Sequence, residues 1–443
     1  MAKDKPLTDR MYGFLAEDED ARVCKDIPEA ACNDQPRAFM AHIFALTLTK
    51  LGDSLVSARL VLPWMLSTLG APAVFISALV PLRESLALLP QLFIAQRLRE
   101  RPVRKWFWVA GSFGQALALV GMLLAVIYLR ATALGWAVVT LLALFSLARG
   151  VCSVTIKDVE GKTISKSRRG RLSGIAAAAA GLLSVLTALV IIFSPALFDE
   201  QLSNGSTTLF VALLAFAIML WTSAALIYAQ VPEVAGATEG GGNAIVEALK
   251  SVRLLWTDKQ FGQFVLTRSL LVSSAFSIPY IVVMIQRSGE SSLTNLGGMM
   301  LASGLAGLMA GRFWGKWSDS ASHHVMAAAA LLAVLVMAVA LGLFVYADNW
   351  LLLQPVAALL IFTAAVAHHG ARVGRKTYLV DMATQETRAQ FTAVSNTVIG
   401  LVLLLGILLG LVDTYFGVAA VMLLLIGLGL TAAARAMRLP AVE

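Results

Sequence analysis

Seven ionisable side chains stand well inside long apolar segments of this 443-residue chain, and their chemistry is the first guide to function. They are Lys50, Asp53, Arg59, Arg83, Glu84, Arg149 and Arg268. A charge in an apolar environment costs roughly 3 kcal/mol or more unless it is paired or hydrated. We therefore expect these groups to pair with one another or to line a water-filled site.

The first segment carries three of these charges. Lys50 and Asp53 are three residues apart, so a helix places them on one face, about 20 to 24 Å along its length and near the middle of a bilayer. Arg59 follows six residues after Asp53. In a regular helix it points largely elsewhere, and we expect it to extend outward to the membrane surface.

The second segment carries Arg83 and Glu84 between Pro81 and Pro90. Adjacent helical residues diverge by about 100°, so these two are not expected to face one cavity squarely. Asp53 with Arg83 is the expected ion pair. It could serve only to lock two helices together, because an unpaired member would be so unfavourable in lipid.

A carboxylate between cations can also load and release a proton as its partners move. Asp53 is our first candidate for proton coupling, with Glu84 in reserve and His368 next. For His368 and its neighbour His369, the plainer interpretation is that they are polar residues at a helix end. The sequence predicts no metal site and no cofactor, and its three cysteines predict no disulfide framework.

The composition defines the environment of these charges. Hydrophobic residues make up 58% of the chain and charged residues only 14%, with a mean hydropathy of +0.78. This excludes a soluble enzyme, since soluble chains carry about a quarter charged residues. The net charge of +8 comes from Lys and Arg between apolar runs, so we expect a lipid bilayer and not nucleic acid as the partner.

Apolar segments long enough to cross a bilayer as helices number twelve. They are approximately 39–67, 73–96, 106–129, 133–156, 172–193, 208–228, 261–285, 296–317, 325–346, 350–373, 391–412 and 415–434. Lys and Arg gather at the loops after every second segment, whereas the opposite loops hold only Arg130 and Arg287. The positive-inside rule then places both termini in the cytoplasm.

The polar stretch 231–258 divides the chain into a bundle at 38–230 and a bundle at 259–436, with tails at 1–37 and 437–443. A short helix is expected near 26–32. A constant offset of 219 residues relates the halves: Glu100 to Asp319, Lys157 to Lys376, Arg169 to Arg388, and Arg149 to His368. The sustained register indicates two homologous six-helix bundles.

Two loops then carry the residues of a known motif. The loop after the second segment has Glu100, Arg104 and Lys105, and the loop after the eighth has Gly315, Asp319, His323 and His324. With these residues the chain resembles the major facilitator superfamily, although the first copy lacks both glycines of the motif and the second lacks one glycine and two strong bases. The resemblance implies an all-α polytopic protein of twelve transmembrane helices in two pseudo-symmetric six-helix bundles.

The resemblance also implies roles for residues. Glu100 and Asp319 would act as gating carboxylates, with Arg169 and Arg388 as candidate partners, although these charges could instead only anchor loops at the headgroups. Because the first, fourth, seventh and tenth helices line the cavity in this family, Lys50, Asp53, Arg149 and Arg268 would converge there. The Gly-Pro signature that antiporters carry in the fifth helix is missing from 172–193.

We therefore expect a monomeric secondary active transporter in a bacterial inner membrane. It would move a small anionic or zwitterionic solute by alternating access, coupled to protons, with Lys50, Arg83, Arg149 and Arg268 binding the substrate. A polyspecific drug/proton efflux antiporter is the alternative. A membrane-embedded hydrolase is the alternative of another class, because Gly52–Leu55 spells Gly-Asp-Ser-Leu, but the Asp-x-x-His partner of that motif is missing.

Overall fold

The computed structural model describes Tyr12 and residues 27–197, 207–236, 238, 252–289, 293–384 and 387–442. Within these residues the regular elements are α-helices and two short 3-10 helices. Those before the central stretch are α2 (Glu29–Asn33), α3 (Gln35–Leu55), α4 (Val61–Thr68), α5 (Ala73–Leu88), α6 (Gln91–Arg99), α7 (Lys105–Tyr128), α8 (Ala131–Thr163), α9 (Lys166–Leu197) and α11 (Thr207–Ala229).

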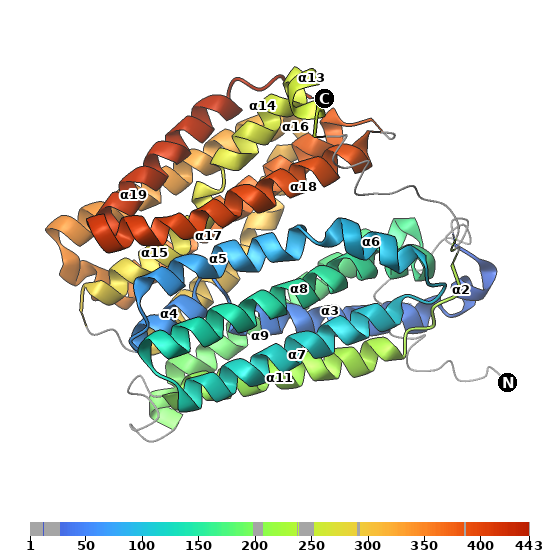
Figure 1. Cartoon of the computed structure of the whole chain (residues 1–443), viewed down its shortest axis with the longest axis horizontal. Coiled ribbons are helices and arrows are strands. Elements are labelled where there is room, and N and C mark those ends of the chain that lie inside the picture. The colour runs from blue at the N-terminus through green and yellow to red at the C-terminus, as the bar shows by residue number, and fades with distance from the viewer. Residues whose placement is uncertain are drawn as a thin grey trace.

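The second half follows the same all-helical plan. Its elements are α13 (Leu254–Thr257), α14 (Lys259–Leu270), α15 (Ser273–Arg287), α16 (Leu293–Tyr346), η1 (Asp348–Leu352), α17 (Gln354–Met382), α18 (Arg388–Leu405), η2 (Gly406–Leu408) and α19 (Leu409–Ala436). Figure 1 shows the blue-to-green helices of the first half below the yellow-to-red helices of the second. The two halves meet along a seam where α5 packs against α18 and α19, α9 against α16, and α4 against α15.

The sequence analysis predicted one continuous helix over 39–67, and this prediction was wrong. The segment breaks between Leu55, where α3 ends, and Val61, where α4 begins. Pro63 supplies the physical reason, because its ring would clash with the carbonyl of Arg59 in a continuous helix and it has no N–H to donate. The break gives Arg59 a direction that a regular helix would not.

Two long elements contain breaks of their own. At 1.5 Å per residue the 54 residues of α16 would reach about 80 Å, far more than a hydrocarbon core of about 30 Å. The backbone leaves the helical conformation at Ala321 in α16 and at Gly417 in α19, where φ is 81° and favours glycine. The break at Ala321 lies between the predicted segments 296–317 and 325–346, and the break at Gly417 lies two residues inside the predicted segment 415–434.

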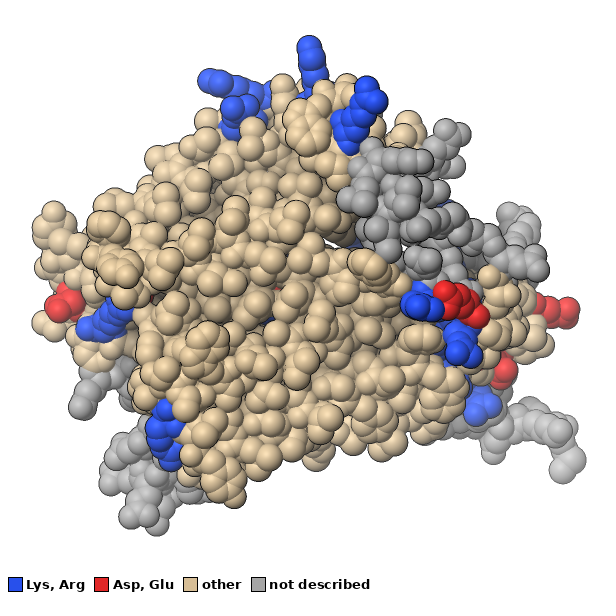
Figure 2. Space-filling model, viewed as in Figure 1, with Lys and Arg blue, Asp and Glu red and all other residues tan. Residues whose placement is uncertain are grey.

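The surface agrees with a protein that sits in lipid. Figure 2 shows a broad uncharged middle, with Lys, Arg, Asp and Glu gathered towards the ends of the molecule. Nine helical segments of the described chain are long and apolar enough to cross a membrane. The chain is a multi-pass membrane protein, and the count of twelve spans stays a prediction.

Glycines allow the halves to approach closely at the seam. A side chain at Gly410 of α19 would meet the Cβ of Ser77 on α5 at 2.9 Å, and one at Gly297 of α16 would meet Ile192 on α9 at 2.9 Å. Small residues at such positions let helices pack through their backbones. At the start of the chain the predicted short helix is present as α2, and its Cys32 is disulfide-bonded, which the sequence analysis did not predict.

Candidate functional site

A cavity of about 450 Å³ lies between the two halves, walled by α3, α5 and α8 on one side and by α14, α17 and α18 on the other. Its volume falls in the range of small-molecule sites. Its charged lining consists of six arginines and two carboxylates: Arg59, Arg83, Arg149, Arg268, Arg372, Arg375, Asp53 and Glu84. Ser57, Gln91, Ser153, Ser274 and His368 add neutral polar groups.

Asp53 is held by two arginines at once. Its Oδ1 accepts a hydrogen bond from Arg83 Nη2 at 2.6 Å, and its Oδ2 pairs with Arg149 Nη1 at 2.5 Å. The Arg83 guanidinium also lies over the ring of Phe145, 5.0 Å from its centroid. The expected pairing of Asp53 with Arg83 is therefore present, and Arg149 joins α8 to the same carboxylate.

Glu84 lines the same cavity and pairs with Arg59, whose Nη2 lies 2.7 Å from Glu84 Oε1. Two expectations were wrong here. Arg59 turns inward because the chain breaks between α3 and α4, so its side chain leaves from an irregular segment. Arg83 and Glu84 both reach the cavity because each finds its own partner in the first segment, Asp53 for one and Arg59 for the other.

Arg268 enters the cavity from α14, as expected, but it contacts neutral partners. Its Nη1 donates to Ser395 Oγ at 2.5 Å and its Nη2 donates to Asn396 Oδ1 at 2.9 Å, both on α18. Its Nε is buried and makes no hydrogen bond with the described residues. The guanidinium is thus fixed in place without being neutralised.

Arg372 and Arg375 are cavity residues that the sequence analysis missed. The apolar run predicts a tenth segment that ends at residue 373, with both arginines among the basic residues at its end. In the structure α17 continues to Met382, so both arginines belong to the helix. The helix outlasts the apolar run because Arg372 and Arg375 line the cavity, where water can solvate charge.

His368 is 5% exposed and lines the cavity, and neither of its ring nitrogens has a hydrogen-bond partner among the described residues. The 219-residue offset holds here too, because Arg149 and His368 both line the cavity, as do Ser153 and Arg372. The two halves thus contribute corresponding positions of α8 and α17 to one site. The interpretation of His368 as a helix-end residue was wrong.

Lys50 lies away from the main cavity. It lines a smaller space of about 150 Å³ inside the first half, together with Thr49, Trp108 and Gln115. Arg149 and Ser153 line both spaces. Of the other predicted binding residues, Lys50 therefore shares a space with Arg149 but not with Arg83 or Arg268, although it shares a helix face with Asp53.

One end of the cavity is closed by contacts between the halves. The hydroxyls of Ser77 on α5 and Tyr280 on α15 lie 2.9 Å apart, and Gln286 Nε2 donates to the carbonyl of Trp64 at 3.1 Å. Towards the other end a second cavity of about 440 Å³ follows, between α6, α8 and α18. It shares Leu88 of α5 and Gln91 of α6 with the first, so the two cavities adjoin there.

The predicted gating residues have other contacts than those expected. Glu100 Oε2 pairs with Arg97 Nη1 at 3.3 Å on the exposed end of α6, and Asp319 is exposed near the break in α16. Arg169 donates to the carbonyls of Ile164 and Gly161, both at 2.9 Å. Arg388 donates to the carbonyls of Ala383 and Val380 at 3.5 and 3.2 Å.

These arginine contacts repeat with the same spacing, five and eight residues back along the chain. In each half they bond carbonyls at or near the end of the preceding helix, α8 in one and α17 in the other. Cations at a helix C-terminus stabilise its unsatisfied carbonyls. These contacts of Arg169 and Arg388 cap the ends of α8 and α17, and partnership with Glu100 or Asp319 stays a prediction.

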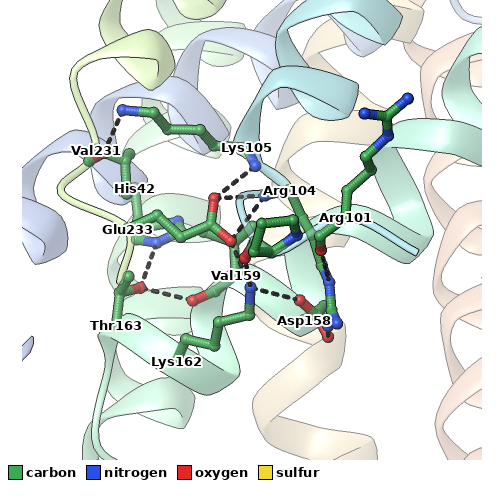
Figure 3. A network of polar contacts seen from close by, with 11 residues as sticks. His42, Arg101, Arg104, Lys105, Asp158, Val159, Lys162, Thr163, Val231 and Glu233 are labelled. Carbon is green, nitrogen blue, oxygen red and sulfur yellow. Dashed lines mark hydrogen bonds and ion pairs between the residues drawn. The ribbon is translucent and has the colours of Figure 1, made fainter. Parts of the chain in front are cut away.

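Near the same end the first half carries a polar cluster, shown in Figure 3, that we call the Glu233 clasp. Glu233 is fully buried and accepts hydrogen bonds from the backbone N–H groups of Arg104 and Lys105 and from Lys162 Nζ at 2.6 Å. Arg104 in turn pairs with Asp158 at 2.5 Å. Sequence reasoning placed Arg104 and Lys105 in a gating motif but did not find Asp158 or Glu233.

No family model matches the sequence, and no curated protein does. Solved structures match in fold. A nucleoside transporter, NupG, has a TM-score of 0.68 at 14% identity, with 91% of this chain and 100% of that chain covered. A D-xylose-proton symporter has a TM-score of 0.68 at 13% identity, with 92% of this chain and 98% of that chain covered. A POT family transporter in complex with 5-aminolevulinic acid has a TM-score of 0.66 at 11% identity, with 93% of this chain and 98% of that chain covered.

At these identities the likeness concerns the fold, which is the major facilitator fold that the sequence analysis predicted. The three proteins are described as transporters, and none of them as an enzyme.

Proposed function

We propose that the chain is a secondary active transporter that moves a small anionic solute across a bacterial inner membrane by alternating access. The observation that carries this proposal is the charge of the cavity, where six arginines face two carboxylates that are already ion-paired. Such a cavity concentrates anions. Guanidinium groups bind carboxylate and phosphate groups through paired hydrogen bonds.

The arrangement of the halves supports alternating access. The cavity is closed at the Ser77–Tyr280 end and adjoins a second cavity at the other. The basic loops and the Glu233 clasp lie at the end that has the second cavity, which the positive-inside rule assigns to the cytoplasm together with both termini. We interpret this arrangement as open towards the inside, with the bundles 38–230 and 259–436 as the moving units and one chain sufficient for the site.

Proton coupling is part of the proposal, and Asp53 is its first candidate. Protonation of Asp53 would weaken its bonds to both Arg83 and Arg149 and release two guanidinium groups towards the cavity. One carboxylate would thus connect proton loading to anion binding. The likeness in fold to a D-xylose-proton symporter is compatible with coupling, and Glu84, which is paired once, remains the second candidate.

The cavity weighs against the two alternatives. A drug/proton antiporter for cations needs a free carboxylate, but Asp53 and Glu84 are both compensated and the remaining charge would repel a cation. The hydrolase interpretation requires an activated Ser54, yet its hydroxyl bonds the Leu51 carbonyl at 2.6 Å and Ser184 at 2.9 Å. Gly52 of that motif has a packing role instead, because Trp221 occupies the space of a side chain there.

Uptake into proteoliposomes with an imposed pH gradient tests the proposal. The panel would contain phosphorylated, carboxylated and zwitterionic solutes beside lipophilic cations. We expect accumulation of at least one anion, lost when the gradient is collapsed by a protonophore. Accumulation of cations alone would instead support the antiporter. Chemical conversion of a solute without accumulation would support the enzyme.

A further inference from the structure

The six cavity arginines differ in whether they have a carboxylate partner. Arg59, Arg83 and Arg149, all in the first half, are ion-paired with Glu84 and Asp53, so that three guanidinium groups share two carboxylates. Arg268, Arg372 and Arg375, all in the second half, have no carboxylate within ion-pair distance among the described residues. Most of the uncompensated positive charge of the cavity therefore belongs to one wall, formed by α14 and α17.

On α17 three polar residues form a column. His368, Arg372 and Arg375 are spaced by four and three residues, which places them on one helix face, and all three line the cavity. Like charges one turn apart repel, so Arg372 and Arg375 would be stabilised by an anion between them. Neither makes a hydrogen bond or ion pair with the part of the chain that the structure describes.

Two members of this wall are buried and incompletely bonded. His368 is 5% exposed with both ring nitrogens unpartnered, and Arg268 is 8% exposed with an unpartnered Nε. Buried polar groups almost always have a hydrogen-bond partner, and an orphaned one costs about 1 to 3 kcal/mol. Donors kept unpaired against a cavity are typical of a site whose partner is a ligand.

We propose that Arg268, Arg372, Arg375 and His368 form a subsite for a doubly charged oxyanion, either a phosphate monoester or a dicarboxylate. A singly charged anion would leave two of the three guanidinium groups uncompensated, whereas a dianion leaves one. Both ligand classes present several oxygen acceptors, which suit guanidinium forks. As a substrate subsite, this inference rests on the proposed transport function, but the binding itself can be measured separately.

The test uses the purified full chain in detergent, in a buffer without phosphate or sulfate. Calorimetric titration would compare glycerol 3-phosphate and succinate as dianions, acetate as a monoanion and glycerol as a neutral probe. We expect one dianion class to bind at least tenfold more tightly than acetate, and glycerol not to bind. The two dianions distinguish a phosphate ester from a dicarboxylate.

Three substitutions locate the site. Arg372→Gln and Arg375→Gln should each weaken dianion binding tenfold or more, whereas Arg435→Gln, the same change at an exposed position near the end of α19, should leave it unchanged. The dianion affinity of Arg372→Lys should lie between that of wild type and that of Arg372→Gln, because lysine keeps the positive charge but lacks the forked donors of the guanidinium group. Thermal unfolding of each ligand-free variant identifies any that is misfolded, and the remaining arginine variant then decides.

The outcomes separate the two proposals. Equal dianion binding by wild type, Arg372→Gln and Arg375→Gln would overturn the subsite, as would equal affinity for acetate and the dianions or no anion binding at all. Dianion binding that depends on these arginines, in a protein whose proteoliposomes accumulate nothing, would support the subsite while transport fails. Accumulation of a monoanion that is insensitive to both substitutions would support transport while the subsite fails.

Discussion

The Ser77 hydroxyl on α5 and the Tyr280 hydroxyl on α15 lie 2.9 Å apart and join the two halves of the chain at the closed end of the cavity. Next to them, Gly410 of α19 approaches α5 so closely that an added Cβ would lie 2.9 Å from the Cβ of Ser77. If the transporter alternates, these contacts must separate once in each cycle. This end of the seam is therefore a place to arrest the cycle.

A disulfide across the closed end of the cavity should hold the two halves together there. We expect Ser77→Cys with Gly410→Cys, in a background without Cys24, Cys32 and Cys152, to form a disulfide once α5 and α19 move apart by about 1 Å, because the bond needs a Cβ separation of about 3.8 Å and the present packing gives 2.9 Å. Oxidation should reduce uptake at least tenfold, and a reducing agent should restore it. The single cysteine variants are the controls, and full uptake by the cross-linked protein would exclude separation at this end.

Asp53→Asn should abolish concentrative uptake while leaving counterflow exchange. The substitution removes the charge that holds Arg83 and Arg149 and the group proposed to carry the proton. We expect accumulation driven by a pH gradient to fall at least tenfold, with exchange of labelled for unlabelled solute within about threefold of wild type. Glu84→Gln is the matched comparison, because that carboxylate pairs with one arginine only. Full accumulation by both variants would move the coupling site elsewhere, with His368 next.

Glu233→Gln should destabilise the protein far more than Glu100→Gln. Glu233 is fully buried and accepts three N–H donors, one of them charged, and hydrogen bonds to charged groups contribute about 1.5 to 3 kcal/mol each. Glu100 lies in an exposed pair with Arg97, and such pairs contribute about 0.2 to 1 kcal/mol. Thermal unfolding in detergent should show a fall of several degrees for the first and little change for the second. Equal shifts would show that the Glu233 clasp contributes no more than a surface pair.

Arg169→Gln and Arg388→Gln should have similar effects, because the two arginines bond equivalent carbonyls at the ends of α8 and α17. A cation at a helix C-terminus contributes about 0.3 to 1 kcal/mol. Each variant should therefore unfold at a slightly lower temperature, with Lys at either position recovering part of the loss. Transport rates that fall sharply without any change in stability would instead support the predicted gating role.

Reporter fusions test the orientation. A fusion after Ser165, between α8 and α9, should be active with a cytoplasmic reporter and inactive with alkaline phosphatase. The physical reason is the cluster of Lys and Arg in 157–171, which is retained on the cytoplasmic side during insertion. A fusion after Arg130, between α7 and α8, is the matched control with the opposite expected result. Alkaline phosphatase activity at Ser165 would invert the proposed direction of the cavity.

The sequence by itself determined the features that depend on local solvent and on repetition. Apolar runs indicate which segments lie in lipid, so the fold class and most helices could be predicted from them. The offset of 219 residues predicted the relation of Arg169 to Arg388, and their contacts repeat because each bonds carbonyls only five and eight residues away. The Asp53–Arg83 pair was predictable because few anions lie within the apolar segments to balance the cations.

Only the tertiary structure decided which charges share the cavity. Arg59 enters it through a break in the first segment, and Arg372 and Arg375 enter it because α17 continues past its apolar run. The Glu233 clasp joins residues up to 129 positions apart, and nothing local in the sequence marks them as partners. Hydropathy reports whether a position faces lipid or water, but not whether that water is bulk solvent or a cavity between helices. That distinction depends on how segments remote in sequence pack together.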